Sequence, residues 1–344
     1  MVLYDQWYIA AFADELQDEI LARTFCHQPV VLYRLDDGGV VALEDRCCHR
    51  HLPLSKGKLT DNGLQCGYHG LTFDRTGACV SVPGQSLVPP GAHVRPYRTE
   101  ERHGLIWIWM GDERNSDPVE IPDYHWIDDP AWATVGGSIP LKAHYMLSID
   151  NLLDLTHEYY VHNSTLGAEA IADHPVRTER FDSSVRVTRW IHDEDPGPFW
   201  RMALGRDIDC DRWQIVNFHL PSHTMLDVGV APAKTGAPEG DRSQAIEGRV
   251  CISLTPIDDR NSWYFWAFCR NFRTDDPDMD TTFQKAVTGA YMEDVTVLEA
   301  QQAMMDITEN PWKIDVNADA GQLAGRRLYD DALRRQESQL QAAE

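Results

Sequence analysis

The chain has 344 residues, of which 43% are hydrophobic and 25% charged, a composition typical of a globular protein with one large or two ordinary domains. Its formal net charge of −23 argues against a nucleic acid partner and against adsorption to an anionic membrane, because both depend on lysine and arginine. No run approaches the roughly 18 apolar residues of a membrane span, and the N-terminus lacks a secretory pattern, so we expect a cytoplasmic protein.

The N-terminal third is predicted to consist of strands and turns. The segment "PVVLYRLDDGGVVALED" (29–45) contains two β-rich runs around a turn, which is typical of a hairpin. "GLTFDRTGACVSV" (70–82) repeats this pattern, and "GLIWIWMGD" (104–112) is a further buried strand that ends at glycine. Helical periodicity is nearly absent, so we predict an all-β domain over residues 1–115.

The pattern changes after a polar stretch with two prolines (112–123), which we interpret as a linker. A helical segment is predicted from about Leu147 to Val161, and a long helix from about Thr281 to Met305. Strand-like runs lie at 185–192, 212–220, 224–231, 249–255 and 262–270. These elements predict an α+β domain over residues 116–344, with an antiparallel sheet and a long late helix.

Eight cysteines without an export signal indicate metal binding or catalysis rather than a disulfide framework. Five of them have no suggestive partner nearby and are interpreted as small apolar residues: Cys26, Cys79, Cys210, Cys251 and Cys269. The remaining three, Cys47, Cys48 and Cys66, lie in a histidine-rich stretch.

That stretch, "CCHRHLPLSKGKLTDNGLQCGYHGL" (47–71), predicts the first metal site. It contains Cys47-x-His49 and, after sixteen further residues, Cys66-x-x-His69. Two thiolates and two imidazoles can hold one zinc ion or a [2Fe–2S] cluster. Each loop offers one cysteine and one histidine, whereas a zinc finger pairs like ligands, and no helix is predicted here. We therefore favour a cluster with two cysteines on one iron and two histidines on the other.

The helix "DNLLDLTHEYYVH" (150–162) predicts a second metal site. Asp150, Asp154 and His157 share one face of a regular helix, but His162 lies 140° from His157 at about 100° per residue. We therefore predict a widening or a break of the helix near residues 159–161. Two histidines and one carboxylate form the facial triad of non-haem iron enzymes. The late helix supplies the candidate carboxylates, among which periodicity cannot choose: Glu293, Asp294 and Glu299.

Together the two motifs resemble those of the Rieske non-haem iron oxygenases, especially the oxygenase components of vanillate and, more distantly, dicamba O-demethylases. Asp150, Asp154, His157 and His162 fill the family's helix motif, whereas Cys48 stands where its cluster motif usually has proline. Cys47 keeps the motif spacing and is taken as the ligand. The resemblance implies a Rieske domain followed by a helix-grip (StART-like) catalytic domain.

The resemblance also implies roles for single residues. Asp294 is expected to be the carboxylate ligand of iron, and Asn151 to lie beside the iron. Asp154 is expected to bridge His157 to His69 of a neighbouring subunit, because a carboxylate can orient both imidazoles. This bridge implies a homotrimer arranged head to tail.

The reaction of this family needs two external electrons, which implies a reductase with FMN and a plant-type [2Fe–2S] centre. Arg46, Arg50, Lys56 and Lys58 flank the cluster loops and can receive an acidic ferredoxin domain, although a solvated loop explains them equally well. The expected reaction is the O₂-dependent removal of an O-methyl group from a methoxylated aromatic acid such as vanillate.

Other activities on the same scaffold stay open at this point. They are cis-dihydroxylation of an aromatic ring and oxidation of an N- or C-methyl group. A plain electron carrier would need no facial triad, and a plain binding protein would need no cluster. For the substrate pocket, the strands of residues 211–229 supply Asn217 and His219 as candidate polar contacts, although each can be an ordinary strand residue.

Overall fold

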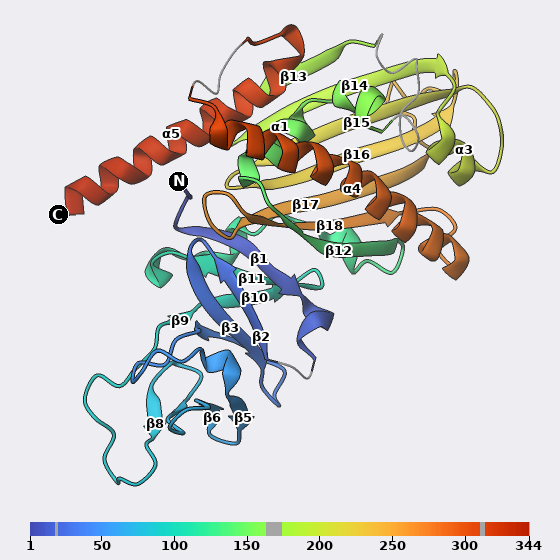
Figure 1. Cartoon of the computed structure of the whole chain (residues 1–344). Helices are drawn as coiled ribbons and strands as arrows, with labels where there is room; N and C mark the ends of the chain where they lie inside the picture. The colour runs from blue at the N-terminus through green and yellow to red at the C-terminus, as the bar shows by residue number, and fades with distance from the viewer. Residues whose placement is uncertain (18–19, 163–173, 310–313, 344) are drawn as a thin grey trace. The chain divides into compact units, whose positions relative to one another are not determined.

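A computed structural model describes residues 1–17, 20–162, 174–309 and 314–343 of the chain (Figure 1). It divides into two compact units, Met1–Pro122 with Thr255–Asp258, and Asp123–Leu254 with Asp259–Glu344. The first unit thus extends a few residues past the predicted domain boundary at 115 and also takes up a short later segment. In the described ranges, no helix is both long and apolar enough to cross a membrane.

The described part of the first unit is built from strands and turns that form three antiparallel sheets, with the orders β1-β11-β10, β2-β3-β4-β9 and β5-β6-β7-β8. The strands are β1 (Gln6–Phe12), β2 (Leu21–Phe25), β3 (Gln28–Arg34), β4 (Val40–Glu44), β5 (Lys58–Thr60), β6 (Gly63–Gln65), β7 (Thr72–Phe73), β8 (Cys79–Ser81), β9 (Pro96–Tyr97), β10 (Thr99–Arg102) and β11 (Leu105–Met110). The pairs β3–β4 and β7–β8 confirm the two predicted hairpins.

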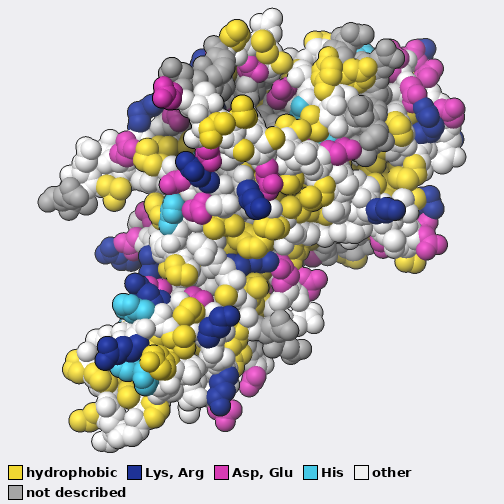
Figure 2. Space-filling view, in the orientation of Figure 1, with side chains coloured by type: hydrophobic (Ala, Val, Ile, Leu, Met, Phe, Trp, Pro, Cys, Tyr) yellow, Lys and Arg dark blue, Asp and Glu magenta, His cyan; other side chains and the backbone are white. Residues whose placement is uncertain are grey.

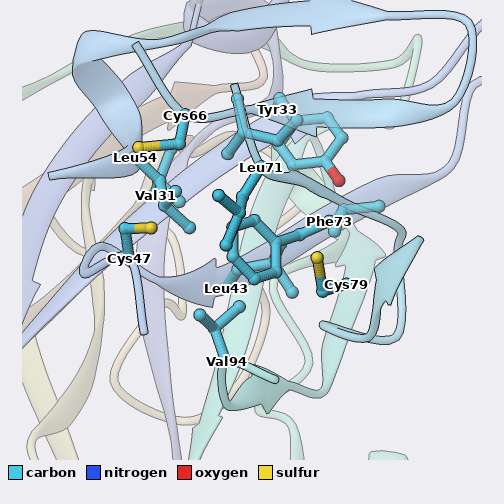
Figure 3. Packing of buried hydrophobic residues seen from close by; sticks show 12 residues of the cluster. Val31, Tyr33, Leu43, Cys47, Leu54, Cys66, Leu71, Phe73, Cys79 and Val94 are labelled. Atoms are coloured by element: carbon cyan, nitrogen blue, oxygen red, sulfur yellow. The ribbon is translucent and has the colours of Figure 1, made fainter. Parts of the chain in front are cut away.

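One hydrophobic cluster fills the part of this unit that carries the cysteine motif (Figure 3). Figure 3 shows Phe73 at its centre, with Cys47 and Cys66 together on one side and Cys79 on the other. Burial raises the pKa of the Cys79 thiol, as expected for a thiol that acts as a small apolar side chain. Within this core, Cys79 therefore lies apart from the two motif cysteines.

The second unit is built around a seven-stranded antiparallel sheet with the order β12-β18-β17-β16-β15-β14-β13. Its strands are β12 (Ala133–Leu141), β13 (Val176–Arg180), β14 (Ser184–Glu194), β15 (Cys210–His219), β16 (His223–Pro232), β17 (Ile246–Pro256) and β18 (Ser262–Arg270). The five predicted strand-like runs are the five inner strands, β14 to β18. The two edge strands, β12 and β13, were not predicted. The predicted α+β class, with an antiparallel sheet and a long late helix, is confirmed.

Helices cover one face of this sheet (Figure 1). The described helices are α1 (Tyr145–Leu153), α2 (His157–Val161), α3 (Pro198–Leu204), α4 (Pro277–Ile307) and α5 (Ala320–Ala343). Figure 1 shows α4 running across the sheet, with α1 beside it. The second predicted metal site draws its residues from α4 and from α2, the short helix that follows α1 in the chain.

The early helix is interrupted at Asp154, a break that was not predicted, and it ends at Val161, next to the break predicted near residues 159–161. Residue Asp154 leaves the helical region with φ −108° and ψ 94°, and α2 starts again at His157. The Oδ1 atom of Asp154 accepts hydrogen bonds from the backbone N–H of Thr156 at 2.9 Å and from its hydroxyl at 2.6 Å. Aspartate side chains that bond to nearby backbone in this way compete with helical hydrogen bonds.

The last helix, α5, was missed because its sequence is mostly polar and charged. It packs on α1 through glycine: a Cβ atom at Gly321 would lie 2.4 Å from the carbonyl oxygen of Leu153. Arg326 on α5 forms an ion pair with Asp150 on α1, with its Nε 2.9 Å from Oδ1. Asp150 therefore ties α1 to α5 rather than facing the metal site.

The close approach of α5 predicts opposite effects of the same substitution at two helical glycines. Gly321→Ala should lower the free energy of unfolding by about 1–3 kcal/mol, because the new Cβ forces α5 away from α1. The new Cβ atom in Gly289→Ala on α4 would meet no atom within 4 Å. This variant should raise the free energy of unfolding by about 0.5–1 kcal/mol through helix propensity alone. Denaturant unfolding of both variants measures this, and a Gly321→Ala protein as stable as Gly289→Ala would refute the packing argument.

Candidate metal centres

Two loops of the first unit fold into the same turn. In each, the backbone N–H of the cysteine donates to the carbonyl five residues later, and the N–H four residues later donates back to the cysteine carbonyl. The partners are Leu52 and His51 for Cys47, and Leu71 and Gly70 for Cys66. The fourth residue after each cysteine has a positive φ, 60° at His51 and 74° at Gly70. The two loops are therefore a structural repeat, which the unequal Cys–His spacing hides.

The four candidate ligands in these loops place their thiols inside and their imidazoles outside. Cys47 and Cys66 are each 2% exposed, whereas His49 and His69 are exposed, with ring centres 4.6 Å apart. Burial raises the pKa of the Cys47 thiol to about 11, although the backbone N–H groups of His49 and Arg50 donate to its sulfur and lower it. Such donors favour the thiolate, which is the form that binds metal.

This arrangement fits a two-iron cluster better than a zinc ion. A tetrahedral zinc site needs all four ligand atoms around one point. Among the described residues, the set whose ligand atoms all lie within 4.8 Å of one another is in the second unit. The four candidate ligands of these two loops do not form such a set. Cys48 is exposed, unlike the two buried thiols, so it does not take the place of Cys47 in the buried pair.

The second candidate centre consists of His157, His162 and Asp294, whose ligand atoms lie within 4.8 Å of one another. The Oδ1 atom of Asp294 is 3.6 Å from Nε2 of His157 and 3.3 Å from Nε2 of His162. His157 begins α2 and His162 follows its last residue, and the centres of their rings lie 5.2 Å apart. On a regular helix a rotation of about 140° would separate the two side chains. Both rings can face Asp294 because His162 lies just beyond the end of α2.

Each histidine of this centre is oriented through its other ring nitrogen. The Nδ1 atom of His157 is hydrogen-bonded to the backbone carbonyl of Asp154. The Nδ1 atom of His162 lies 2.8 Å from Oε2 of Glu293. Both Nε2 atoms therefore remain directed at Asp294, whose Oδ1 also accepts a hydrogen bond from Asn151 at 3.1 Å. Partners of this kind fix the tautomer and the ring angle of a histidine that binds metal.

The structure separates the three carboxylates that periodicity left as alternatives. Asp294 faces both Nε2 atoms, as the family resemblance implied. Glu293, its neighbour in the chain, orients His162 instead. Glu299 lies further along α4 and accepts a hydrogen bond from the backbone N–H of Lys142 at 3.0 Å. The orienting role of Glu293 was not predicted, although its position beside Asp294 brought it into the candidate set.

The charges of the second centre call for a cation. Asp294 is only 5% exposed, and a buried carboxylate is stable only when it is paired or bound to metal. Burial lowers the pKa of His162, but the neighbouring Asp294 and Glu293 outweigh it and raise the pKa to about 9. Two imidazoles and a carboxylate are the donor set of a mononuclear non-haem Fe(II) site, so the residues present fit this metal.

A cavity of about 120 Å³ adjoins the triad and has mainly apolar walls. Helices α3 and α4 and the inner strands contribute to it, with Phe199, Trp200, Leu226, Val228, Ile252 and Phe268 among the apolar lining residues. Asn151, Arg212 and Gln214 are polar groups at the same cavity. An apolar cavity of roughly 150 Å³ can hold one benzene ring, so this one suits a small aromatic compound.

The structure does not bring Asn217 and His219 to this cavity. The lining residues of the sheet, such as Arg212, Gln214 and Leu226, have even numbers, and alternate residues of a strand point to opposite faces. Asn217 is on the other face, where its Oδ1 accepts a hydrogen bond from Nε of Arg186 at 2.8 Å. His219 is exposed at the end of β15. The candidates were polar residues of the correct strand but on the wrong face.

Comparisons with known proteins assign both halves of the chain. Residues 6–92 match the Rieske [2Fe-2S] domain family, and residues 141–335 match the vanillate O-demethylase oxygenase C-terminal domain family. The chain is 40% identical to a putative toluene-4-sulfonate monooxygenase system iron-sulfur subunit of Comamonas testosteroni, over 97% of this chain and 98% of that protein. It is 38% identical to a vanillate O-demethylase oxygenase subunit of a Pseudomonas species, over 98% and 96%.

Two further similarities involve dicamba-oxidising proteins. The chain is 38% identical to the oxygenase component of dicamba O-demethylase from Stenotrophomonas maltophilia, over 86% of each protein. A crystal structure of dicamba monooxygenase bound to 3,6-dichlorosalicylic acid superposes with a TM-score of 0.91 at 34% identity, covering 99% of this chain and 98% of that one.

The geometry of the triad predicts which carboxylate of α4 is needed to hold iron. Asp294→Ala should lower the iron content from about three to about two per chain and leave the visible absorption of the cluster unchanged. The matched control Glu299→Ala removes a carboxylate of the same helix that bonds to backbone, and it should retain about three irons. Iron analysis and absorption spectra of the purified proteins measure both. Full iron content in Asp294→Ala would remove this residue from the site.

Proposed function

This chain belongs to the Rieske oxygenase family of the vanillate O-demethylase oxygenase subunits, and from that premise we propose that it removes an O-methyl group from a methoxylated aromatic acid such as vanillate or a relative. It is the oxygenase component of a Rieske monooxygenase, with a [2Fe–2S] cluster and a mononuclear iron. We assign the cluster to residues 1–115, on Cys47, His49, Cys66 and His69, and the mononuclear iron to residues 116–344, on His157, His162 and Asp294.

The cavity beside the triad is the observation that carries the proposed substrate class. Its apolar walls suit one aromatic ring. Asn151, Arg212 and Gln214 are polar lining groups that already donate to Asp294 or Glu158, so an acidic or phenolic substituent would be bound through their remaining N–H groups. Vanillate and toluene-4-sulfonate, which the names of two relatives contain, are both small aromatic anions. A methoxylated aromatic acid combines the ring, the anionic group and a carbon for oxidation.

The reaction consumes the methoxy compound, O₂, two electrons and two protons, and it yields a phenol, formaldehyde and water. The iron, when bound, supplies the activation of O₂, and the cluster supplies electrons singly. The protein supplies geometry: the cavity walls orient the ring and exclude water, and Glu293 and Asp154 fix the two imidazoles. Hydroxylation of the methoxy carbon gives a hemiacetal, whose C–O bond then breaks to release formaldehyde.

We further propose that Asp154 links this centre to the cluster of a neighbouring subunit in a homotrimer. Its Oδ1 accepts two hydrogen bonds from Thr156, and its backbone carbonyl is bonded to His157. Among the described residues, Oδ2 has no hydrogen-bond partner, so it is available to the exposed imidazole of His69 from the next subunit. Such a carboxylate would connect two imidazoles by hydrogen bonds.

A reductase partner is implied by the multicomponent relatives, and we propose that a flavin- and ferredoxin-type reductase docks beside the cluster loops. Arg46 is paired with Glu44, but Arg50, Lys56 and Lys58 are exposed and form no ion pair with another described residue. Figure 2 shows Lys and Arg side chains next to histidines in the part of the first unit that holds β5 to β8. This basic surface would attract an acidic ferredoxin domain.

A second candidate reaction is oxidation of an aryl methyl carbon. The relative at 40% identity is named for toluene-4-sulfonate, whose oxidisable substituent is methyl rather than methoxy. The same cavity and metal centres would serve this reaction, because the oxidised group in either case is a one-carbon substituent of an aromatic acid. The product separates the two: an aryl methyl substrate gives a benzylic alcohol, whereas an aryl methoxy substrate gives formaldehyde and a phenol.

The substrate proposal predicts a defined product pattern. With reductase, NADH and O₂, the protein should convert at least one methoxybenzoate and release about one formaldehyde per NADH consumed. The same panel should include 4-toluenesulfonate and ring compounds without a methyl group, with products identified by chromatography and mass spectrometry. NADH consumption without formaldehyde from any methoxylated acid would refute O-demethylation. A benzylic alcohol or a cis-diol as the main product would identify the alternative reactions.

The docking proposal predicts that charge reversal weakens coupling to the reductase. Arg50→Glu with Lys56→Glu should lower the reductase-coupled rate roughly tenfold at low salt and reduce its dependence on ionic strength. The control Lys285→Glu changes the charge of an exposed residue on α4 and should keep the wild-type rate. Stopped-flow reduction of the cluster at several salt concentrations measures this. Unchanged rates and salt slopes would show that these residues are only a solvated loop.

A further inference from the structure

The short helix α2 lacks the usual means of attachment. It has five residues, His157–Val161, and Glu158 is its only buried one. Short helices are seldom stable alone and are normally held by apolar side chains packed on their surroundings. Tyr160 is 71% exposed, and the other members of α2 are half-buried. Attachment of this helix to the sheet therefore depends on a carboxylate.

Glu158 forms a buried network with three side chains of the sheet. Its Oε2 accepts hydrogen bonds from Nη2 of Arg189 at 2.8 Å and from Nε2 of Gln214 at 2.5 Å, and its Oε1 accepts one from Nη2 of Arg212 at 2.5 Å. All four side chains are less than 9% exposed. Arg189 also donates through Nε to Gln214 at 2.9 Å, which joins the partners to each other.

This network connects α2 to a rigid base. Arg189 belongs to β14, and Arg212 and Gln214 belong to β15, the strand paired with it. Arg189 and Gln214 are direct neighbours across the two strands. Two ion pairs with arginines and one hydrogen bond from an amide restrict both the distance and the angle of a carboxylate. Apolar contacts alone would allow the helix to shift along the sheet.

Glu158 also lies between the two histidines in the chain. It follows His157 directly, and its backbone carbonyl accepts a hydrogen bond from the N–H of His162 at 3.1 Å. The side chain thus attaches α2 to the sheet while the backbone of the same residue holds His162. Glu158, Arg212 and Gln214 line the cavity together with both histidines, so a shift of this residue reaches the metal site and the substrate space.

We propose that Glu158 is a positioning residue for the mononuclear iron: its buried ion pairs to Arg189 and Arg212 fix the separation of His157 and His162. This inference rests on the proposed assignment of these histidines as iron ligands, but it does not depend on which substrate is oxidised. Glu158 does not itself bind the metal. Its removal weakens iron binding by leaving α2 attached through its ends alone.

The test compares iron affinity in variants of two ion-pair networks of the same sheet, one buried and one partly exposed. Glu158→Gln keeps the shape but removes the charge, and Glu158→Ala removes the side chain. The control is Asp227→Asn on β16. Asp227 is 17% exposed and bonds to Trp213, Arg242 and Arg249, but it does not line the cavity. The cluster-containing protein, freed of mononuclear iron by a mild chelator, is titrated anaerobically with Fe(II), and thermal unfolding is recorded in parallel.

We expect Glu158→Ala to raise the Fe(II) dissociation constant by about tenfold to a hundredfold, with a smaller rise in Glu158→Gln, and the cluster spectrum to stay unchanged. Asp227→Asn should lower the melting temperature without changing iron affinity. Wild-type affinity in both folded Glu158 variants would overturn the proposal, as would an equal loss in Asp227→Asn. If Glu158→Ala does not fold, Glu158→Gln decides alone.

A further variant separates this inference from the ligand assignment. His162→Ala should abolish tight Fe(II) binding. If His162→Ala binds Fe(II) like the wild type, the assigned ligands are wrong and the positioning role of Glu158 is overturned with them. A failure to demethylate any aromatic ether, by contrast, leaves the Fe(II) titrations and their outcome unaffected.

Discussion

The buried carboxylate of Asp294 is the constraint on which the second unit depends. A charge that is only 5% exposed must be compensated, and its nearest groups are two imidazoles and the amide of Asn151. Glu293, the preceding residue of α4, binds the other ring nitrogen of His162. Two consecutive acids thus face the two nitrogens of one imidazole: Asp294 lies near Nε2 of His162, and Glu293 is bonded to Nδ1. A divalent cation would compensate this excess of negative charge.

The first unit solves the opposite problem, because its cluster must remain accessible to electrons. The repeated turn buries the sulfurs of Cys47 and Cys66 and leaves the imidazoles of His49 and His69 exposed. A cluster held in this way is shielded from solvent on its thiolate side and open on its imidazole side. In our proposal, electron donors and acceptors meet the histidine edge, which lies near the exposed basic residues and receives Asp154 of the next subunit.

Spacing in the sequence predicted the two metal-binding motifs and the inner strands, because ligand chemistry and side-chain alternation are local properties, whereas the choice of Asp294 came from the family resemblance. The features that were missed depend on tertiary contacts. The break at Asp154 is made by its hydrogen bonds to Thr156, which strict helical geometry could not reveal. Helix α5 is mostly polar, and it packs through Gly321 and a short buried stripe of Ala324, Leu328 and Tyr329. Glu158 was not singled out in the sequence, because burial of a charge is decided by partners far away in the chain.

Asn217 and His219 do not line the cavity, for a reason that also indicates how one scaffold can serve different substrates. The proposed ligands of the mononuclear iron lie on or next to α2 and α4, whereas much of the cavity wall comes from one face of the sheet. Leu226 on β16 lies directly opposite Val250 on β17, and both line the cavity. Changes at such positions alter the shape of the substrate space and leave the triad in place. No motif marks them, so the chemistry can be recognised from the sequence while the substrate depends on which residues share that face.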